Sequence, residues 1–229
     1  MINLSTEVAG IALKHPVMIG SGVLNDKPEL IERAIIEGEP SAIVTKTITW
    51  EPREGYLPPI IIELPYGGFI NAVGLANPGK DSIADLVTVG LKYKTPIIVS
   101  IAGSSVKEFI DLAILAEECK ASGIELNLSC PHVKGLGAEL GKDPRLSYEI
   151  VRDITSTIKI PTLAKLGPWD NVVEIASKVL EAGARGLVLV NTIRGMAIDI
   201  YTMRPILSNK VGGLSGPPLH PIAVYIVYT

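Results

Sequence analysis

One segment, residues 124–137, constrains the fold of this chain more than any other, because an apolar strand in it runs directly into a polar loop that carries glycines. Apolar and polar residues alternate from 124 to 129, which is the pattern of a β-strand. Pro131 has no backbone N–H to donate, so the ladder of hydrogen bonds stops before it. We therefore expect Cys130 to lie at the carboxyl end of a strand, where a loop begins.

Short apolar runs alternate with longer amphipathic stretches along most of the chain. We expect strands at 17–20, 42–46, 97–100, 124–128, 162–166 and 186–190, and helices at 27–37, 81–91, 106–122, 144–158 and 171–182. Strands that are nearly continuous apolar runs indicate a parallel sheet covered by helices. The sequence therefore predicts an α/β fold of the TIM (β/α)8 barrel type, with about six βα units present.

Two common nucleotide-binding turns are excluded. A dinucleotide-binding turn fails because Leu140 stands where the pattern G-x-G-x-x-G, counted from Gly135, needs its third glycine. A P-loop fails because Asp143 follows Gly141 and Lys142, where serine or threonine is required.

Composition limits the class of protein and its partners. A length of 229 residues with 47% hydrophobic residues predicts one domain, residues 1–229, with a large core. A formal charge of −3 provides no basic field, so we expect no nucleic acid partner. The longest apolar runs, 96–102 and 222–228, are shorter than the roughly 18 residues of a membrane span. We expect no membrane segment and assign both runs to buried strands and helices.

Cysteine and histidine usage narrows the setting further. The chain has 2 cysteines, and no basic leader precedes an apolar stretch, which predicts a cytoplasmic protein. His15, His132 and His220 have no second ligand at metal spacing, so we expect no metal site.

Polar side chains stand where the predicted strands end. They are Ser21, Lys46, Ser100, Asn127, Lys165, and Asn191 with Thr192. The carboxyl ends of barrel strands form the catalytic face, so we expect these side chains to surround one site. Residues 48–80, rich in proline and glycine, are too long for an ordinary connection and are interpreted as a substrate-side insertion with a hairpin strand at 59–64.

Lys46 and Lys165 end apolar strands, where a lysine must reach water or meet a negative group. Two lysines in one barrel mouth, beside amides, favour a ligand that accumulates negative charge, such as a reduced flavin. Lys165 keeps a second interpretation, because a Schiff-base aldolase also uses a lysine at a strand end.

Cys130 also has two interpretations. A free cysteine is most often a small buried hydrophobe, and we expect that role for Cys119 in its helix. Cys130 instead follows Asn127 and Ser129 and precedes His132, and in such a polar loop a thiol can act as an acid or a base. We therefore favour a catalytic role for Cys130.

Five motifs together resemble one enzyme family. They are I-N-A-V-G-L-A-N-P-G at 70–79, E-L-N-L-S-C-P at 125–131, A-K-L at 164–166, V-N-T at 190–192 and G-G-L-S-G-P at 212–217. In this order they resemble the class 1 dihydroorotate dehydrogenases, most closely the catalytic subunit of subclass 1B. The resemblance runs through nearly the whole chain.

The resemblance implies FMN as cofactor, and oxidation of dihydroorotate to orotate in pyrimidine (UMP) biosynthesis. It implies substrate contacts from Lys46, Asn71, Ala72, Val73, Gly74, Leu75, Asn127, Asn191 and Thr192. It implies FMN contacts from Ser21, Lys46, Thr47, Ser100, Asn127, Lys165, Val190 and Gly216. Cys130 would be the base that takes the C5 proton while hydride leaves C6 for the flavin. Residues 131–143 would form a lid over the site.

Two positions depart from the family pattern. His132 and Ser100 stand where these dehydrogenases usually have asparagine, and both resemble the flavin domain of dihydropyrimidine dehydrogenase. In that domain a cysteine acts as an acid during uracil reduction, which gives an alternative function. The motif at 70–79 favours dihydroorotate.

The chain ends at Thr229, whereas the family has two further βα units that help to hold the FMN phosphate. We therefore expect this chain alone to bind FMN poorly or not at all. In the second case it would be an inactive fragment, which is the alternative of another class. We also expect a homodimer and, for subclass 1B, an iron–sulfur flavoprotein subunit that passes electrons to NAD. Other class 1 enzymes use fumarate, so the electron acceptor stays open.

Overall fold

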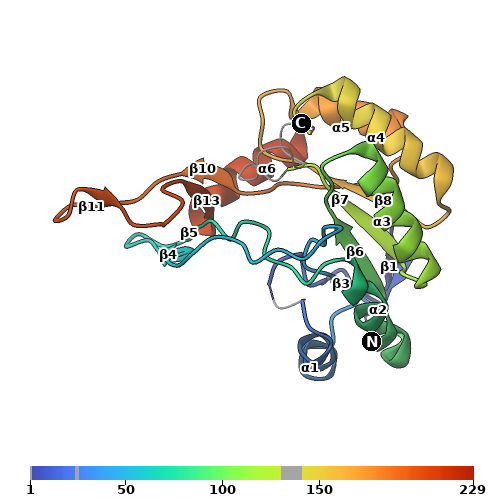
Figure 1. Cartoon of the computed structure of the whole chain (residues 1–229). Helices are drawn as coiled ribbons and strands as arrows, with labels where there is room; N and C mark the ends of the chain where they lie inside the picture. The colour runs from blue at the N-terminus through green and yellow to red at the C-terminus, as the bar shows by residue number, and fades with distance from the viewer. Residues whose placement is uncertain (1, 24–25, 130–140) are drawn as a thin grey trace.

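The computed structural model describes residues 2–23, 26–129 and 141–229 of the chain. A parallel sheet covered by helices forms the body, and an antiparallel arm projects from one side of it (Figure 1). The carboxyl ends of the parallel strands face the arm. Polar residues gather at this junction of body and arm.

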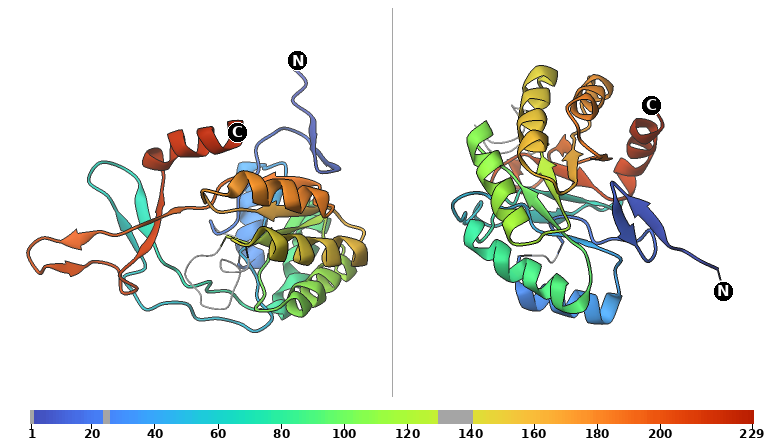
Figure 2. Two further views of the ribbon diagram at one scale, coloured as in Figure 1. Left: turned by 90° about the horizontal axis from the view of Figure 1, so that it is seen from above. Right: turned by 90° about the vertical axis from the view of Figure 1, so that its right-hand side faces the viewer.

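The body is built on five parallel strands in the order β3-β6-β7-β8-β9. Their bounds are Ile43–Val44, Ile97–Ile101, Gly123–Asn127, Thr162–Lys165 and Gly186–Val188. The strands curl as part of a barrel, so the predicted α/β barrel architecture is confirmed (Figure 2). The strand predicted at 17–20 is reduced to one parallel bridge between Ile19 and Ile43, because Ile19 bonds only the edge of β3.

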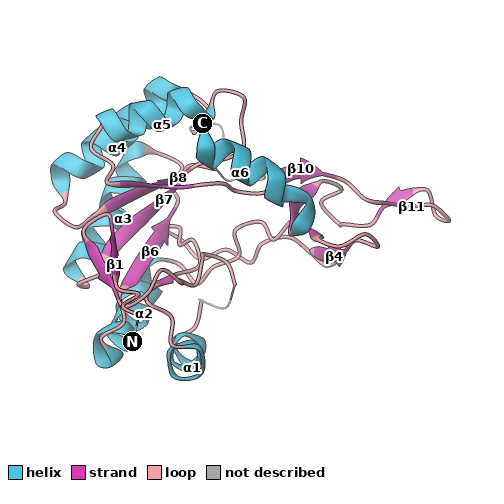
Figure 3. Cartoon of the chain, turned by 180° about the vertical axis from the view of Figure 1, so that it is seen from behind, coloured by secondary structure: helices cyan, strands magenta, loops and turns pink. Residues whose placement is uncertain are grey.

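Helices cover the outer face of the sheet (Figures 2 and 3). They are α1 Pro28–Gly38, α2 Ile83–Tyr93, α3 Val106–Glu118, α4 Pro144–Thr157 and α5 Val172–Glu181, with a 3-10 turn η1 at Lys80–Ser82. On β7, Ile124 and Leu126 point outward into the main core and are fully buried. Each such side chain stabilises the fold by about 1.5–3 kcal/mol relative to exposure. The helix predicted at 106–122 ends earlier, at Glu118, because Lys120 takes a left-handed conformation with φ of 67°.

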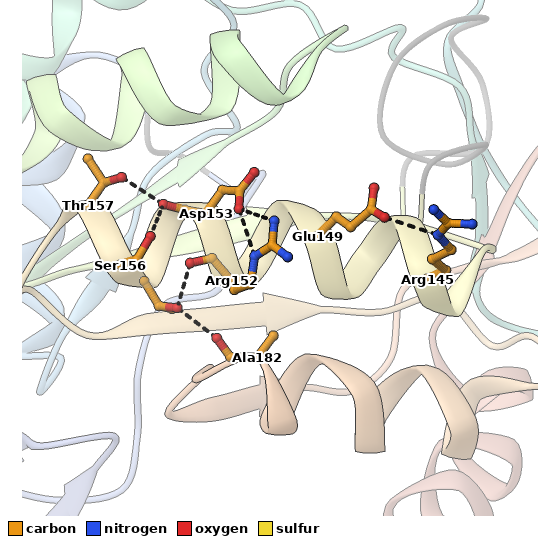
Figure 4. Close-up of polar contacts among 8 residues, drawn as sticks. Arg145, Glu149, Arg152, Asp153, Ser156, Thr157 and Ala182 are labelled. Atoms are coloured by element: carbon orange, nitrogen blue, oxygen red, sulfur yellow. Dashed lines mark hydrogen bonds and ion pairs between the residues drawn. The ribbon is translucent and has the colours of Figure 1, made fainter.

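Helix α4 shows why these segments become helices. Asp143 caps its start, with a carboxylate that accepts hydrogen bonds from the backbone N–H groups of Arg145 and Leu146. Ion pairs, among them Arg145 with Glu149 four residues later, run along its exposed side (Figure 4). Near its end the Thr155 hydroxyl donates to the Ala182 carbonyl at 2.7 Å, which joins α4 to α5.

A hairpin that the sequence analysis missed closes the amino end of the sheet. It consists of β1, Thr6–Val8, and β2, Ile11–Leu13, paired antiparallel. Ile11 and Leu13 pack with Val44 and Leu163 inside the curl of the sheet. The amino end is therefore apolar and filled, which leaves the carboxyl end for ligands.

The arm is an antiparallel sheet in the order β10-β13-β5-β4, with a small hairpin of β11 and β12 beyond it (Figure 1). The bounds are β4 Ile61–Glu63, β5 Phe69–Asn71, β10 Ile193–Gly195, β11 Ile198–Asp199, β12 Arg204–Pro205 and β13 Gly212–Ser215. The hairpin predicted within 48–80 is thus present as β4 and β5. Its pairing with β13 joins segments that lie far apart in the sequence.

The apolar run at 222–228 is not buried as expected. It lies in α6, His220–Tyr228, which follows a 3-10 turn η2 at Pro217–Leu219. Ile226 alone in this helix is buried, whereas Val224 and Val227 are 54% and 64% exposed. The reason is geometric: the helix is apolar on all sides and only one stripe of it touches the body. In the described part of the chain, no helix is both long enough and apolar enough to cross a bilayer.

Candidate active site

A cavity of about 290 Å³ opens at the carboxyl ends of the parallel strands, where the body meets the arm. It is lined by Ser21, Gly22, Lys46, Thr47, Ile61, Asn71, Val73, Gly74, Leu75, Asn127, Lys165, Asn191 and Thr192. Asn127 and Lys165 are the last residues of β7 and β8, and Lys46 follows β3. All the predicted strand-end side chains except Ser100 therefore meet in one place.

Most of the predicted substrate and cofactor residues line this cavity. From the body these are Ser21, Lys46, Thr47, Asn127, Lys165, Asn191 and Thr192, and from the insertion they are Asn71, Val73, Gly74 and Leu75. The insertion at 48–80 therefore supplies one wall of the cavity.

Four of the predicted contact residues lie away from the cavity wall. Ala72 is buried in the core of the arm, because neighbouring residues of an extended chain point to opposite faces. Ser100 is fully buried below the cavity. Val190 packs on the main core, and Gly216 lies in the arm beside Gly68.

Cys130, the predicted base, lies outside the described residues, as does His132. The predicted lid at 131–143 also falls almost entirely outside them, since only residues 141–143 are described. The last described residue before this gap, Ser129, is buried and bonds two of the cavity residues.

Two lining residues were missed. Gly22 has φ of +91°, and a Cβ placed there would lie 3.9 Å from the Lys46 ammonium. Its glycine-rich setting, next to Ser21, is a signal that the sequence analysis did not use. Ile61 reaches the cavity from β4, and its contribution depends on how the arm folds back, which no local pattern reports.

Hydroxyl groups form the floor of the cavity. Thr47 is the centre: its Oγ1 accepts from the Asn127 amide at 3.0 Å and lies 2.9 Å from the Ser100 hydroxyl. The Ser21 hydroxyl is 3.4 Å from the same oxygen. Ser100 in turn donates to the Glu125 carboxylate at 2.8 Å. The floor is therefore a connected network rather than a set of separate side chains.

Glu125 is a buried acid below this floor, only 2% exposed. Burial raises the pKa of its carboxyl, because the charged form loses hydration, while the charge of Lys165 and the bond from Ser100 oppose the rise. Among the described residues Lys165 has no carboxylate within 4.0 Å, so no ion pair occupies it. Lys165 and Lys46 both line the cavity, so their positive charges make it attractive to an anion.

Asn77 orders the part of the insertion that faces the cavity. This amide is only 6% exposed and makes four hydrogen bonds. Its oxygen accepts from the backbone of Thr49 at 3.1 Å and of Gly79 at 2.9 Å. Its nitrogen donates to the Thr49 hydroxyl at 2.8 Å and to the Leu75 carbonyl at 2.7 Å. Residues 73–75 are therefore held against the cavity by a fully satisfied buried amide.

Comparison with known proteins gives one consistent family. The family model described as dihydroorotate dehydrogenase matches residues 3–229. A putative dihydroorotate dehydrogenase A (fumarate) of Aeropyrum pernix is 47% identical over 226 residues, covering 98% of this chain and 73% of that protein. The catalytic subunit of dihydroorotate dehydrogenase B (NAD(+)) of Thermoplasma volcanium is 44% identical over 230 residues, covering 100% of this chain and 75% of that protein. The corresponding subunit of Pyrococcus horikoshii is 46% identical over 230 residues, with 98% and 73% covered.

Proposed function

The chain belongs to the dihydroorotate dehydrogenase family, and from that premise we propose that it oxidises dihydroorotate to orotate in pyrimidine biosynthesis. The observation that carries the proposal is the meeting of two ammonium groups and three amides, from Asn71, Asn127 and Asn191, at one cavity. Dihydroorotate is a carboxylate with two ring carbonyls, so cations and N–H donors are the groups that recognise it.

The floor of the cavity fits a flavin. A flavin ring carries carbonyl and ring-nitrogen acceptors, and the hydroxyl and amide donors around Thr47 match them. Gly22 leaves room beside Lys46, since it has no side chain. We propose FMN as the flavin, held from the body side by Ser21, Thr47 and Lys165, and when bound it accepts the hydride that leaves the substrate.

The residues of this chain then have separate tasks. Lys46 neutralises the substrate carboxylate, and Lys165 neutralises negative charge that develops on the cofactor side of the cavity. Asn71, Asn127 and Asn191 hold the ring through its carbonyl oxygens. Cys130, one residue beyond the buried Ser129, acts as a thiolate. It takes the proton from C5 of the ring, next to C6, the carbon that loses the hydride. The two hydrogens thus leave as a proton and a hydride, and a carbon–carbon double bond forms.

The proposal extends to partners and location. The names of the Thermoplasma and Pyrococcus relatives specify a catalytic subunit and NAD, so we propose an iron–sulfur flavoprotein as the electron-transfer subunit of this protein. The Aeropyrum relative is named for fumarate, which is the competing acceptor. We propose a cytoplasmic location, in keeping with a chain of only 2 cysteines. Family membership favours this function over a Schiff-base aldolase or a dihydropyrimidine dehydrogenase.

A homodimer is proposed from the surface of the arm. The tip hairpin exposes large apolar side chains: Ile198 is 56% exposed, Ile200 78%, Tyr201 90% and Met203 83%. Such a group of exposed apolar residues is typical of a surface that binds another protein.

The deciding experiment is to purify the chain, add FMN and measure its absorbance, flavin stoichiometry and dihydroorotate-dependent reduction of a dye. Under the proposed function, flavin is taken up from excess FMN and orotate forms. A chain that neither retains nor takes up FMN, and shows no turnover, would identify it as the inactive fragment instead. Uracil reduction without dihydroorotate oxidation would favour the dihydropyrimidine dehydrogenase reaction.

A further inference from the structure

Ser129 lies between two amides that line the cavity. It follows β7, is only 2% exposed, and its hydroxyl donates to the Asn127 side-chain oxygen at 2.9 Å. The same hydroxyl oxygen accepts from the Asn191 side-chain nitrogen at 2.7 Å. Asn191 follows β9, and β8 lies between β7 and β9, so this serine connects two strand ends that are not neighbours in the sheet.

The direction of these bonds is fixed by the backbone. The Asn127 oxygen also accepts from the Ser129 N–H at 3.2 Å, and the Asn191 oxygen accepts from the Thr192 N–H at 2.7 Å. A backbone N–H can only donate, so the oxygen of each amide must face it. The serine has one hydroxyl proton, which goes to Asn127, and it can therefore only accept from Asn191.

This arrangement fixes the nitrogen of each amide as its donor, and both residues line the cavity. Asn127 gives one N–H to Thr47 at 3.0 Å, and no group among the described residues accepts the other. Within the described part of the chain, the Asn191 nitrogen has one further acceptor besides Ser129 Oγ, the Ser129 carbonyl at 3.5 Å, the outer limit of a hydrogen bond. This wall of the cavity therefore offers donors, which match the carbonyl oxygens of a ligand.

We propose that Ser129 is a positioning residue for substrate recognition. Its hydroxyl is oriented by the bond to Asn127 and holds Asn191 in place, so that both amides present N–H donors to the ring carbonyls. The inference rests on the proposed function for the identity of the ligand. Without the hydroxyl, Asn127 keeps its backbone partner, whereas Asn191 loses its shortest bond from nitrogen. A side chain that must be ordered when the ligand binds lowers the affinity for that ligand. Asn191 is therefore the residue through which loss of the Ser129 hydroxyl should weaken substrate binding.

The test uses the full chain and three variants. Ser129→Ala removes the hydroxyl, and Ser129→Thr keeps it. Ser41→Ala is the matched control, because Ser41 is also 2% exposed and accepts a backbone N–H, from His15 at 2.9 Å, at the opposite end of the sheet. The measurements are the melting temperature, the order of the Asn191 side-chain amide from ¹⁵N relaxation without ligand, and orotate affinity from calorimetry.

The expected result is that Ser129→Ala lowers the order of the Asn191 amide and weakens orotate binding about tenfold, and that Ser129→Thr restores both. Ser41→Ala should lower the melting temperature by a similar amount with neither effect. An Asn191 amide that stays ordered in Ser129→Ala overturns the inference whatever happens to binding. Should wild type fail to bind orotate while Asn191 still loses order in Ser129→Ala, the positioning role stands and the proposed substrate is wrong.

Discussion

Asn127 and Lys165 are register partners on the neighbouring parallel strands β7 and β8, so an amide and an ammonium enter the cavity side by side. The pairing places a neutral donor for a ring carbonyl next to a fixed positive charge. It also makes the contribution of the charge separable from that of the amide, because each can be changed alone.

Replacing Lys165 with methionine should weaken FMN binding by tenfold or more while leaving the fold intact. Methionine is an unbranched side chain one atom shorter than lysine, and it lacks the charge that faces the ligand. Fluorescence titration of FMN measures the effect. Lys159→Met is the control, because Lys159 is exposed and does not line the cavity. Equal FMN affinity in both variants would show that the charge of Lys165 plays no part.

The buried acid Glu125 should make stability depend on pH. Its pKa is raised in the folded state, mainly by burial, so its contribution is complete below the unfolded pKa and is lost as the pH rises through the folded pKa. Glu125→Gln removes this loss. Relative to wild type, the variant should gain free energy of unfolding as the pH is raised from 4 to 7. Urea unfolding at both pH values measures this, and a difference between the two proteins that does not change with pH would contradict it.

Cys130→Ala should lower the rate of dihydroorotate oxidation by about 10² to 10⁴, as expected for loss of a positioned base. FMN binding should not change, because the thiol acts on the substrate. Cys119→Ala is the control: Cys119 lies at the end of α3, and burial raises the pKa of its thiol, which keeps it unreactive. Turnover close to wild type in Cys130→Ala would exclude the thiol as base.

Asn77→Ala should weaken orotate binding by about tenfold and lower the free energy of unfolding by about 2–3 kcal/mol. Four buried hydrogen bonds are lost, and residues 73–75 are no longer held against the cavity. Calorimetric titration and urea unfolding give the two quantities. Asn171 is half-buried, and its side chain donates one solvent-exposed hydrogen bond to the Lys142 carbonyl, so Asn171→Ala provides the control variant. If Asn77→Ala lost stability at unchanged orotate affinity, Asn77 would support the fold and not the site.

Tyr201→Ser combined with Met203→Ser should convert a dimer into a monomer, because both side chains are more than four-fifths exposed on the arm. Light scattering after size exclusion measures the mass. The pair Val224→Ser and Val227→Ser, on the exposed side of α6, tests whether any loss of apolar surface has the same effect. A wild-type chain that is monomeric at high concentration would refute the dimer.

The parallel strands and their helices were predictable because each is a local pattern of apolar residues that burial then satisfies. The polar strand ends were predictable for a related reason: parallel strands bring their carboxyl ends together, so Lys46, Asn127 and Lys165 had to converge. The pairing of β5 with β13 was missed because it depends on contacts between distant segments. The hairpin of β1 and β2 was missed because each strand has only 3 residues, too few to show an alternating pattern. Glu125 and Asn77 were missed because their roles lie in hydrogen bonds below the surface, and sequence spacing does not report those.

The pairing of Phe69 with Ser215 has a consequence for how the protein matures. Non-local contacts form slowly, since a long loop must close before they gain any free energy. The body is built from neighbouring βα units and can assemble as it is synthesised. β5, in contrast, can pair with β13 only after residues 212–215 have been synthesised. Asn71 and Ile61, which stand on the arm side of the cavity, are therefore placed late. Ligand-binding competence should arise as one of the last events on the folding pathway, after the helices have formed.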